Sequence, residues 1–169
     1  MELISRILDG SLPYDINQGP PDLPESAFRV SQDDKIKRLE RVPLLAECSR
    51  RQLKAVAKIT EVVEVPAGKV LVRAGESGDE FSLIVDGHAR VEIPSRQPVR
   101  LGPGDYFGEM SLLDGGPRSA TVVAETPLRL LVISRRDFSA LLADVPELTR
   151  SILVTLTRRL RQAEQSQRS

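Results

Sequence analysis

Cysteine and histidine are almost absent from this chain of 169 residues, which has one of each and no tryptophan. The single cysteine, Cys48, cannot form an intrachain disulfide, so a reducing cytoplasmic compartment is the expected location. One cysteine and one histidine cannot assemble a metal site of these ligands. A Ser-His or Cys-His catalytic pair would have to use His88, which follows Asp86-Gly87 in a predicted tight turn. We therefore expect no metal ligands, no cofactor and no catalytic residues.

An excess of charge of one sign is also missing, because 24 lysines and arginines balance 24 aspartates and glutamates. Non-specific binding to nucleic acid depends on net positive charge, so no DNA partner is expected. The basic run at residues 158–161 is typical of the solvated end of a helix, where cations suit the helix dipole. No apolar run reaches the ~18–20 residues that span a bilayer, and residues 1–8 do not resemble a signal peptide. Membrane association is therefore not expected.

The chain is predicted to divide into an N-terminal arm of residues 1–30, a domain of residues 31–165 and a disordered tail of residues 166–169. Apolar pairs near the start predict a short helix in the arm that Gly10 would end. Four prolines between positions 13 and 24 are typical of a mobile linker. The arm is either disordered, docked on the domain, or used to bind a partner.

Two helical patterns open the domain. Ser31 is a candidate N-cap, and two aspartates follow it in the first turn, where the helix dipole favours acidic groups. A second helix is predicted to start near Ser49. Pro43 would end the first helix. The buried faces are predicted at Ile36, Leu39 and Val42 in the first helix and at Leu53, Val56 and Ala57 in the second.

After Thr60 the apolar period falls to about 2 residues, which is typical of strands. Short strands bounded by turns are predicted at residues 62–65, 70–73, 81–85, 89–93, 99–101, 121–124 and 128–133. Two helices follow, at residues 135–142 and from Pro146 to about Gln165. The predicted fold class is α+β, an antiparallel β-roll (jelly-roll-like, a double-stranded β-helix) flanked by N-terminal helices and two C-terminal helices.

Residues 104–122 carry groups suited to an anion. A short helix is predicted at residues 109–113, and the backbone N–H groups at a helix start attract anions. Gly108, just before it, would let a ligand approach the backbone closely. Arg118, predicted to open the next strand, offers a planar fork of donors that matches phosphate oxygens.

Two residues beside these groups extend the prediction. Ser119 could add its hydroxyl and its backbone N–H to the phosphate contacts. Glu109 could accept a hydrogen bond from a sugar hydroxyl. One strand-helix-strand unit could therefore hold both a phosphate and a ribose.

Two stretches of this segment resemble the phosphate-binding cassette of cyclic-nucleotide-binding domains. They are Phe107-Gly108-Glu109-Met110-Ser111-Leu112 and Pro117-Arg118-Ser119-Ala120-Thr121-Val122, and the loop between them has a normal family length. Gly75-Glu76-Ser77-Gly78-Asp79-Glu80-Phe81, followed by Ile84 and Gly87, is similar to the family's glycine-marked second hairpin. The resemblance covers roughly residues 36–162.

The resemblance implies a non-enzymatic sensor whose ligand is cAMP, with cGMP as the alternative. It implies that Arg118 pairs with the cyclic phosphate, that Gly108 and Ser119 donate to it, and that Glu109 binds the ribose 2′-hydroxyl. The ligand-binding set that it predicts is Gly108, Glu109, Met110, Ser111, Arg118, Ser119 and Ala120.

The candidates for contact with the base are Val70 and Leu71 on the roll, and Leu156 and Arg159 on the last helix. Many family members cap the base with an aromatic or polar residue of the last helix. No aromatic follows Phe138 in this chain, so a leucine, a threonine or an arginine must do so. Ser119 stands where a hydroxyl can help to bind a guanine ring, which keeps cGMP open.

Binding is expected to draw the cassette and the last two helices toward the roll, and to signal to an unidentified effector protein or a second copy. A monomer and a homodimer both stay open. The alternative function is a degenerate fold that binds no ligand and serves as an interaction scaffold. A transcription regulator would need a DNA-reading helix, and the chain ends about where the last sensor helix should end. A metal-dependent cupin would need several histidines.

Overall fold

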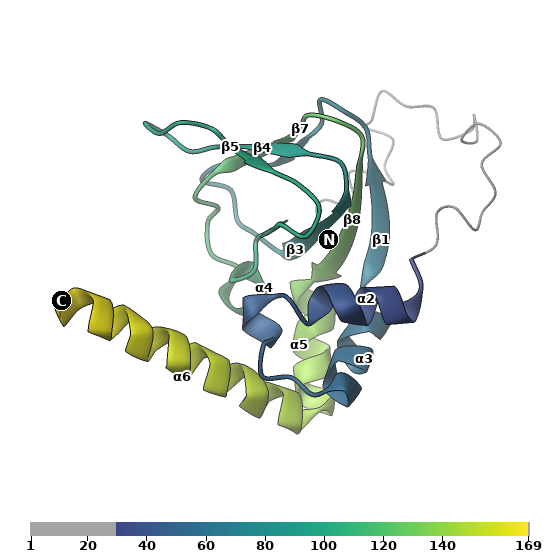
Figure 1. Ribbon diagram of the computed structural model, residues 1–169, viewed down its shortest axis with the longest axis vertical. Helices are drawn as coiled ribbons and strands as arrows, with labels where there is room; N and C mark the ends of the chain where they lie inside the picture. Colours follow the sequence, from purple (N-terminus) through teal and green to yellow (C-terminus); the bar gives the residue numbers. More distant parts are fainter. Residues whose placement is uncertain (1–29, 169) are drawn as a thin grey trace. The chain divides into compact units, whose positions relative to one another are not determined.

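The computed structural model describes residues 30–168, so the predicted helix and linker of the N-terminal arm lie outside the described residues. Figure 1 shows helices at the start, strands in the middle and two helices at the end of the described chain. The chain forms two compact units, one of residues 61–135 and one that joins residues 31–60 to residues 136–168.

The unit of residues 61–135 is an antiparallel β-roll of two four-stranded sheets, with strand orders β1-β8-β3-β6 and β2-β7-β4-β5. The strands are β1 (Glu61–Val65), β2 (Val70–Val72), β3 (Glu80–Asp86), β4 (Ala89–Glu92), β5 (Val99–Leu101), β6 (Tyr106–Phe107), β7 (Thr121–Ala124) and β8 (Leu128–Ser134). The predicted roll is confirmed. Strand β6 was not predicted, because two residues cannot show an alternating pattern.

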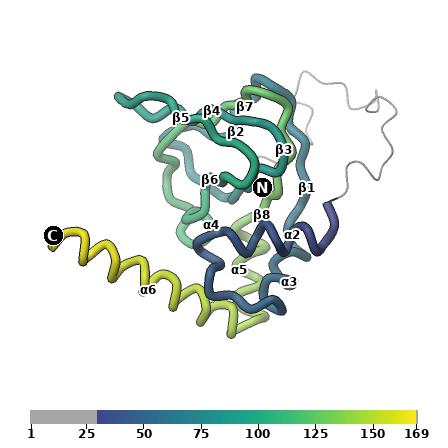
Figure 2. Tube along the Cα trace, viewed as in Figure 1, coloured from purple at the N-terminus to yellow at the C-terminus, as the bar shows by residue number. Residues whose placement is uncertain are grey.

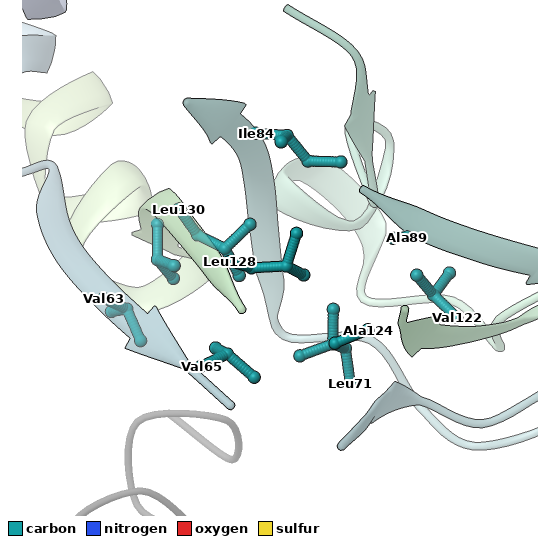
Figure 3. Packing of buried hydrophobic residues seen from close by; sticks show 10 residues of the cluster. Val63, Val65, Leu71, Ile84, Ala89, Val122, Ala124, Leu128 and Leu130 are labelled. Atoms are coloured by element: carbon teal, nitrogen blue, oxygen red, sulfur yellow. The ribbon is translucent and has the colours of Figure 1, made fainter. Parts of the chain in front are cut away.

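Apolar side chains from both sheets fill the roll. Along β1 the side chains of Val63 and Val65 are buried while Glu64 is exposed, as the two-residue period of a strand requires. Figure 3 shows Val63 beside Leu130 and Val65 beside Leu128 of β8, with Ala124 of the other sheet facing Val65. Removal of this apolar surface from water stabilises the roll by roughly 25 cal/mol per Å².

The predicted hairpin turn at Asp86-Gly87 joins β3 to β4. Gly87 has φ +91°, a conformation that favours glycine. A side chain there would also contact the carbonyl oxygen of Pro127, so both the backbone angle and the available space require glycine.

The other unit begins with α2 (Gln32–Leu39), a 3₁₀ helix η2 (Pro43–Leu45) and α3 (Arg50–Lys58). The predicted cap at Ser31 is confirmed, because Ser31 Oγ accepts from Asp34 N at 3.1 Å. The second helix starts near Ser49, as predicted, and Ser49 also forms a capping box with Gln52, which was not predicted. Helix α2 ends at Leu39, before the predicted stripe does. Val42 is buried but extended, and η2 was not predicted, since three residues carry no helical period.

Helices α5 (Arg135–Asp144) and α6 (Pro146–Arg168) close the chain. The buried residues of α6 are Leu148, Ile152 and Thr155, and the helix contacts η2. Figure 2 shows α6 as one uninterrupted helix in yellow. The disordered tail predicted from residue 166 is wrong for residues 166–168, which are helical, because arginine and glutamine favour helix and neither glycine nor proline follows Pro146. Among residues 30–168, no helix has the length and hydrophobicity to cross a membrane.

Candidate functional site

A cavity of about 600 Å³ lies in the β-roll beside the predicted cassette. This volume is in the range of small-molecule sites, roughly 300–1,000 Å³. One part of its wall is apolar and another part is polar. The apolar part includes Val72, Val91, Leu101, Phe107 and Val122, and the polar part includes Glu109, Ser111, Asp114, Arg118 and Ser119. An amphipathic ligand with an anionic group fits such a wall.

Arg118 is held in this wall by two hydrogen bonds. Its Nη1 donates to Ser111 Oγ at 3.1 Å, and its Nη2 donates to the carbonyl oxygen of Glu80 at 2.6 Å. The two bonds start from different nitrogens of one planar group, so together they fix both the position and the plane of the guanidinium.

The backbone around Arg118 is paired with the loop before β3. Arg118 N donates to Glu76 O at 2.8 Å, and Gly75 N donates to Arg118 O at the same distance. Arg118 was predicted to open a strand that runs into the core through Ala120 and Val122. Val122 is buried, as predicted, but β7 begins only at Thr121 and Ala120 is half-buried, because Arg118 pairs with this loop rather than with a neighbour of β7.

Gly108 connects β6 to the helix of the cassette and has φ +79°. A Cβ at this position would lie 2.5 Å from the carbonyl oxygen of Glu80 and would also contact Arg118 Nη1. The structure therefore requires glycine here for the approach of Arg118 and for the backbone angle, whereas the close approach of a ligand to Gly108 stays a prediction.

Helix α4 (Ser111–Asp114) starts two residues later than the predicted helix of residues 109–113. Glu109 lies in the turn before it, is 6% exposed and lines the cavity, where its carboxylate can accept a hydrogen bond. Met110 also lines the cavity and is 48% exposed, which places it at the rim. All seven residues predicted to bind the ligand, from Gly108 to Ala120, line this one cavity.

The predicted base contacts on the roll are not brought to the cavity. Leu71 is 4% exposed and belongs to the core, and neither it nor Val70 lines the cavity. Val72 lines it instead, because the register with β7 shifts between positions 70 and 72. Leu156 and Arg159 belong to α6 in the other unit, and their contact with the base stays a prediction.

Sequence reasoning missed two contributors to the arginine's position. The carbonyl group of Glu80 accepts from Arg118, and Gly78 lies against its guanidinium. Both residues lie in the glycine-marked segment of residues 75–81, whose sequence is similar to a hairpin of cyclic-nucleotide-binding domains. No local pattern, however, shows that a backbone oxygen 38 residues away will meet an arginine.

Comparisons with known proteins agree with this site. Residues 62–145 match the family model described as the cyclic nucleotide-binding domain. A cyclic nucleotide-gated potassium channel of Mesorhizobium japonicum is 42% identical over 107 residues, which are 63% of this chain and 30% of the channel. A cAMP-dependent protein kinase regulatory subunit of Schizosaccharomyces pombe is 37% identical over 114 residues, which are 67% of this chain and 28% of that subunit.

The fold is similar to that of a solved structure. The N-terminal domain of a transcriptional regulator from Streptomyces coelicolor A3(2) superposes with a TM-score of 0.68 at 30% sequence identity, over 77% of this chain and 94% of that domain. The curated relatives above are much longer than this chain, which matches less than a third of each. The family match, the shared fold and the arginine-centred cavity together show that the chain belongs to the cyclic-nucleotide-binding domain family.

Proposed function

We propose that this chain is a non-enzymatic regulatory module that binds cAMP, with cGMP as the alternative ligand. The observation that carries the proposal is the position of Arg118. Its guanidinium lies in the wall of a cavity of ligand size, oriented by Ser111 and by the Glu80 carbonyl. The relatives support a regulatory role, since they are named as a channel gated by cyclic nucleotides and as a kinase regulatory subunit.

In the proposed complex the cyclic phosphate pairs with Arg118, and it receives hydrogen bonds from the backbone at Gly108 and from Ser119. Charge-assisted bonds of this type are about twice as strong as neutral ones. The buried carboxylate of Glu109 accepts from the ribose 2′-hydroxyl. The base lies against the apolar part of the wall, which includes Val72.

The relay of binding to the C-terminal helices is also proposed. Support comes from Arg135, the first residue of α5, whose side chain lies against Gly115 at the end of α4. Arg135 also pairs with Asp79 at 3.4 Å, and its backbone N–H donates to the Asp79 carbonyl at 2.7 Å. A movement of α4 on binding would therefore act directly on the start of α5. The ligand shifts this equilibrium only by the difference in its affinity for the two states.

The partner in this proposal is an effector protein in the cytoplasm. The single cysteine supports that location, because a reducing compartment needs no disulfide. Residues 157–168 of α6 are exposed and offer one surface for the effector. Backbone NMR shifts of α5 and α6 test the relay, which is rejected if those shifts stay fixed on saturation with the nucleotide.

Calorimetric titration with cAMP and cGMP tests the ligand, with Arg118→Ala compared with Arg129→Ala. Arg129 is the matched control, because it pairs with Glu64 and Asp86 and does not line the cavity. We expect one nucleotide per chain, with a loss of roughly 2–5 kcal/mol in Arg118→Ala and unchanged affinity in the control. If neither nucleotide binds the parent protein, the degenerate scaffold becomes the better function.

A further inference from the structure

Gly78 lies directly against the guanidinium of Arg118. A Cβ built on Gly78 would contact Arg118 Nε, and would lie 2.6 Å from Arg118 Cζ and 2.5 Å from Ser111 Oγ. Carbon atoms do not approach other heavy atoms this closely without a bond. The space that a side chain at position 78 would need is therefore already occupied by the two side chains that form the anion site.

The backbone of Gly78 does not itself demand glycine. Its φ lies outside the left-handed region, unlike those of Gly75 and Gly108. The three atoms nearest to the hypothetical Cβ all belong to side chains, and none belongs to the backbone. An alanine at position 78 would therefore be acceptable if Arg118 and Ser111 were shortened.

Gly78 is buried and does not line the cavity. Its backbone N–H donates to the carbonyl oxygen of Gly116 at 3.1 Å, which ties it to the loop that carries Arg118. On another side the guanidinium contacts Gly108, where a Cβ would meet Nη1. Gly78 and Gly108, from different parts of the chain, thus provide the space that the Arg118 guanidinium occupies.

We propose that Gly78 is a positioning residue of the anion site. The absence of a side chain at position 78 lets Arg118 reach both Ser111 Oγ and the Glu80 carbonyl, the two bonds that orient its guanidinium. A Cβ would displace the guanidinium and break this arrangement without touching a ligand. The expected effect on nucleotide affinity rests on the proposed function, whereas the steric coupling between positions 78 and 118 does not.

The test is a double-mutant cycle on the full chain. Gly78→Ala is introduced into the parent protein and into a relieved background that carries Arg118→Ala and Ser111→Ala. Melting temperatures are measured for all four proteins. We expect Gly78→Ala to lower the melting temperature of the parent, and to leave it unchanged or raise it in the relieved background, because alanine restricts the unfolded chain more than glycine does.

The matched control is Gly102→Ala. Gly102 also has an ordinary φ, lies outside the cavity wall, and would place its Cβ no closer than 3.2 Å to the side chain of His88. With cAMP as the probe, we expect Gly78→Ala to lose roughly 10-fold to 100-fold in affinity, the effect of one hydrogen bond to a charged group. Gly102→Ala should stay within about threefold of the parent, well below that loss.

The outcomes test the positioning role of Gly78 and the proposed nucleotide-binding function separately. Equal destabilisation by Gly78→Ala in both backgrounds would show a backbone requirement for glycine and overturn the proposal. Gly78→Ala could lower the melting temperature of the parent but not that of the relieved background, while the parent binds no nucleotide. That result would uphold the positioning role and reject the proposed function. A Gly78→Ala protein that binds cAMP as tightly as the parent overturns the positioning role. If Gly78→Ala does not fold in the parent, its folding in the relieved background upholds the steric conflict, and failure there overturns it.

Discussion

Arg118 and Glu80 are 38 residues apart in the sequence, yet Arg118 Nη2 lies 2.6 Å from the carbonyl oxygen of Glu80. The bond joins the loop before β7 to the first residue of β3. A guanidinium has five N–H groups in a fixed plane, so it can hold this carbonyl and Ser111 and still donate to an anion. The orientation of the Arg118 guanidinium is therefore set by Ser111 and the Glu80 carbonyl, which are groups of the protein itself.

This geometry predicts that lysine cannot replace Arg118. An ammonium group is a point charge without a planar fork, so it cannot contact Ser111 Oγ, the Glu80 carbonyl and a phosphate in the same arrangement. We expect Arg118→Lys to recover only part of the affinity for cAMP that Arg118→Ala loses. Calorimetry of the two variants measures this, and full affinity in Arg118→Lys would show that charge alone is enough.

Glu109 is predicted to recognise the ribose. A charged acceptor forms a hydrogen bond worth about 1.5–3 kcal/mol, against about 0.5–1.5 kcal/mol for a neutral one. The parent should therefore prefer cAMP to 2′-deoxy-cAMP, and Glu109→Gln should narrow that preference by roughly tenfold. Competition binding with both nucleotides provides the measurement. A preference that stays the same in Glu109→Gln would assign the ribose contact to another group.

Two residues of the apolar stripe of α6, about two turns apart, should differ in their effect on stability. Ile152 is 3% exposed, whereas Leu160 is 62% exposed. Ile152→Ala should lower the free energy of unfolding by about 2–5 kcal/mol, because it leaves a cavity. Leu160→Ala should change it by less than ~0.5 kcal/mol, as is usual on a surface.

Urea denaturation of both variants at the same protein concentration checks this difference. A large loss in Leu160→Ala would mean that another surface covers Leu160 in solution. Sedimentation of the parent protein would then show whether that surface belongs to a second copy, which would select the homodimer over the monomer.

Cys48 is predicted to react slowly with alkylating reagents. Burial, assisted by the nearby carboxylate of Glu47, raises the pKa of the Cys48 thiol from 9.0 to about 11. Only the thiolate reacts, so at pH 8 the folded protein should be alkylated roughly a hundredfold more slowly than the protein unfolded in urea. Iodoacetamide labelling followed by mass spectrometry measures both rates, and equal rates would contradict the raised pKa.

The same shift has a consequence for stability. The folded-state pKa lies above the ordinary value of 9.0, so the unfolded chain loses its thiol proton first as the pH rises. The contribution of Cys48 is fully present below pH 9 and is lost between pH 9 and about 11. The melting temperatures of the parent and of Cys48→Ser should converge across this pH range. A constant difference would argue against a stability contribution from the raised pKa of Cys48.

Local chemistry determined much of the fold from sequence. Ser31 was predictable as a cap because the cap bond joins residues only three apart. The strands were predictable because apolar residues recur at every second position. The turn at Asp86-Gly87 was predictable because glycine adopts positive φ. Shorter elements such as β6 and η2 escaped prediction, because two or three residues carry no measurable period.

For the site, the sequence determined which residue types are available, and the segment from Gly108 to Ala120 could be assigned because the cassette is nearly contiguous. Only the tertiary structure decided how these groups are oriented and what surrounds them. It placed Leu71 in the core and Val72 in the cavity wall, through a register shift that no single strand encodes. It also brought Gly78 and the Glu80 carbonyl to Arg118, since contacts between residues 38 or more positions apart depend on how whole strands pair.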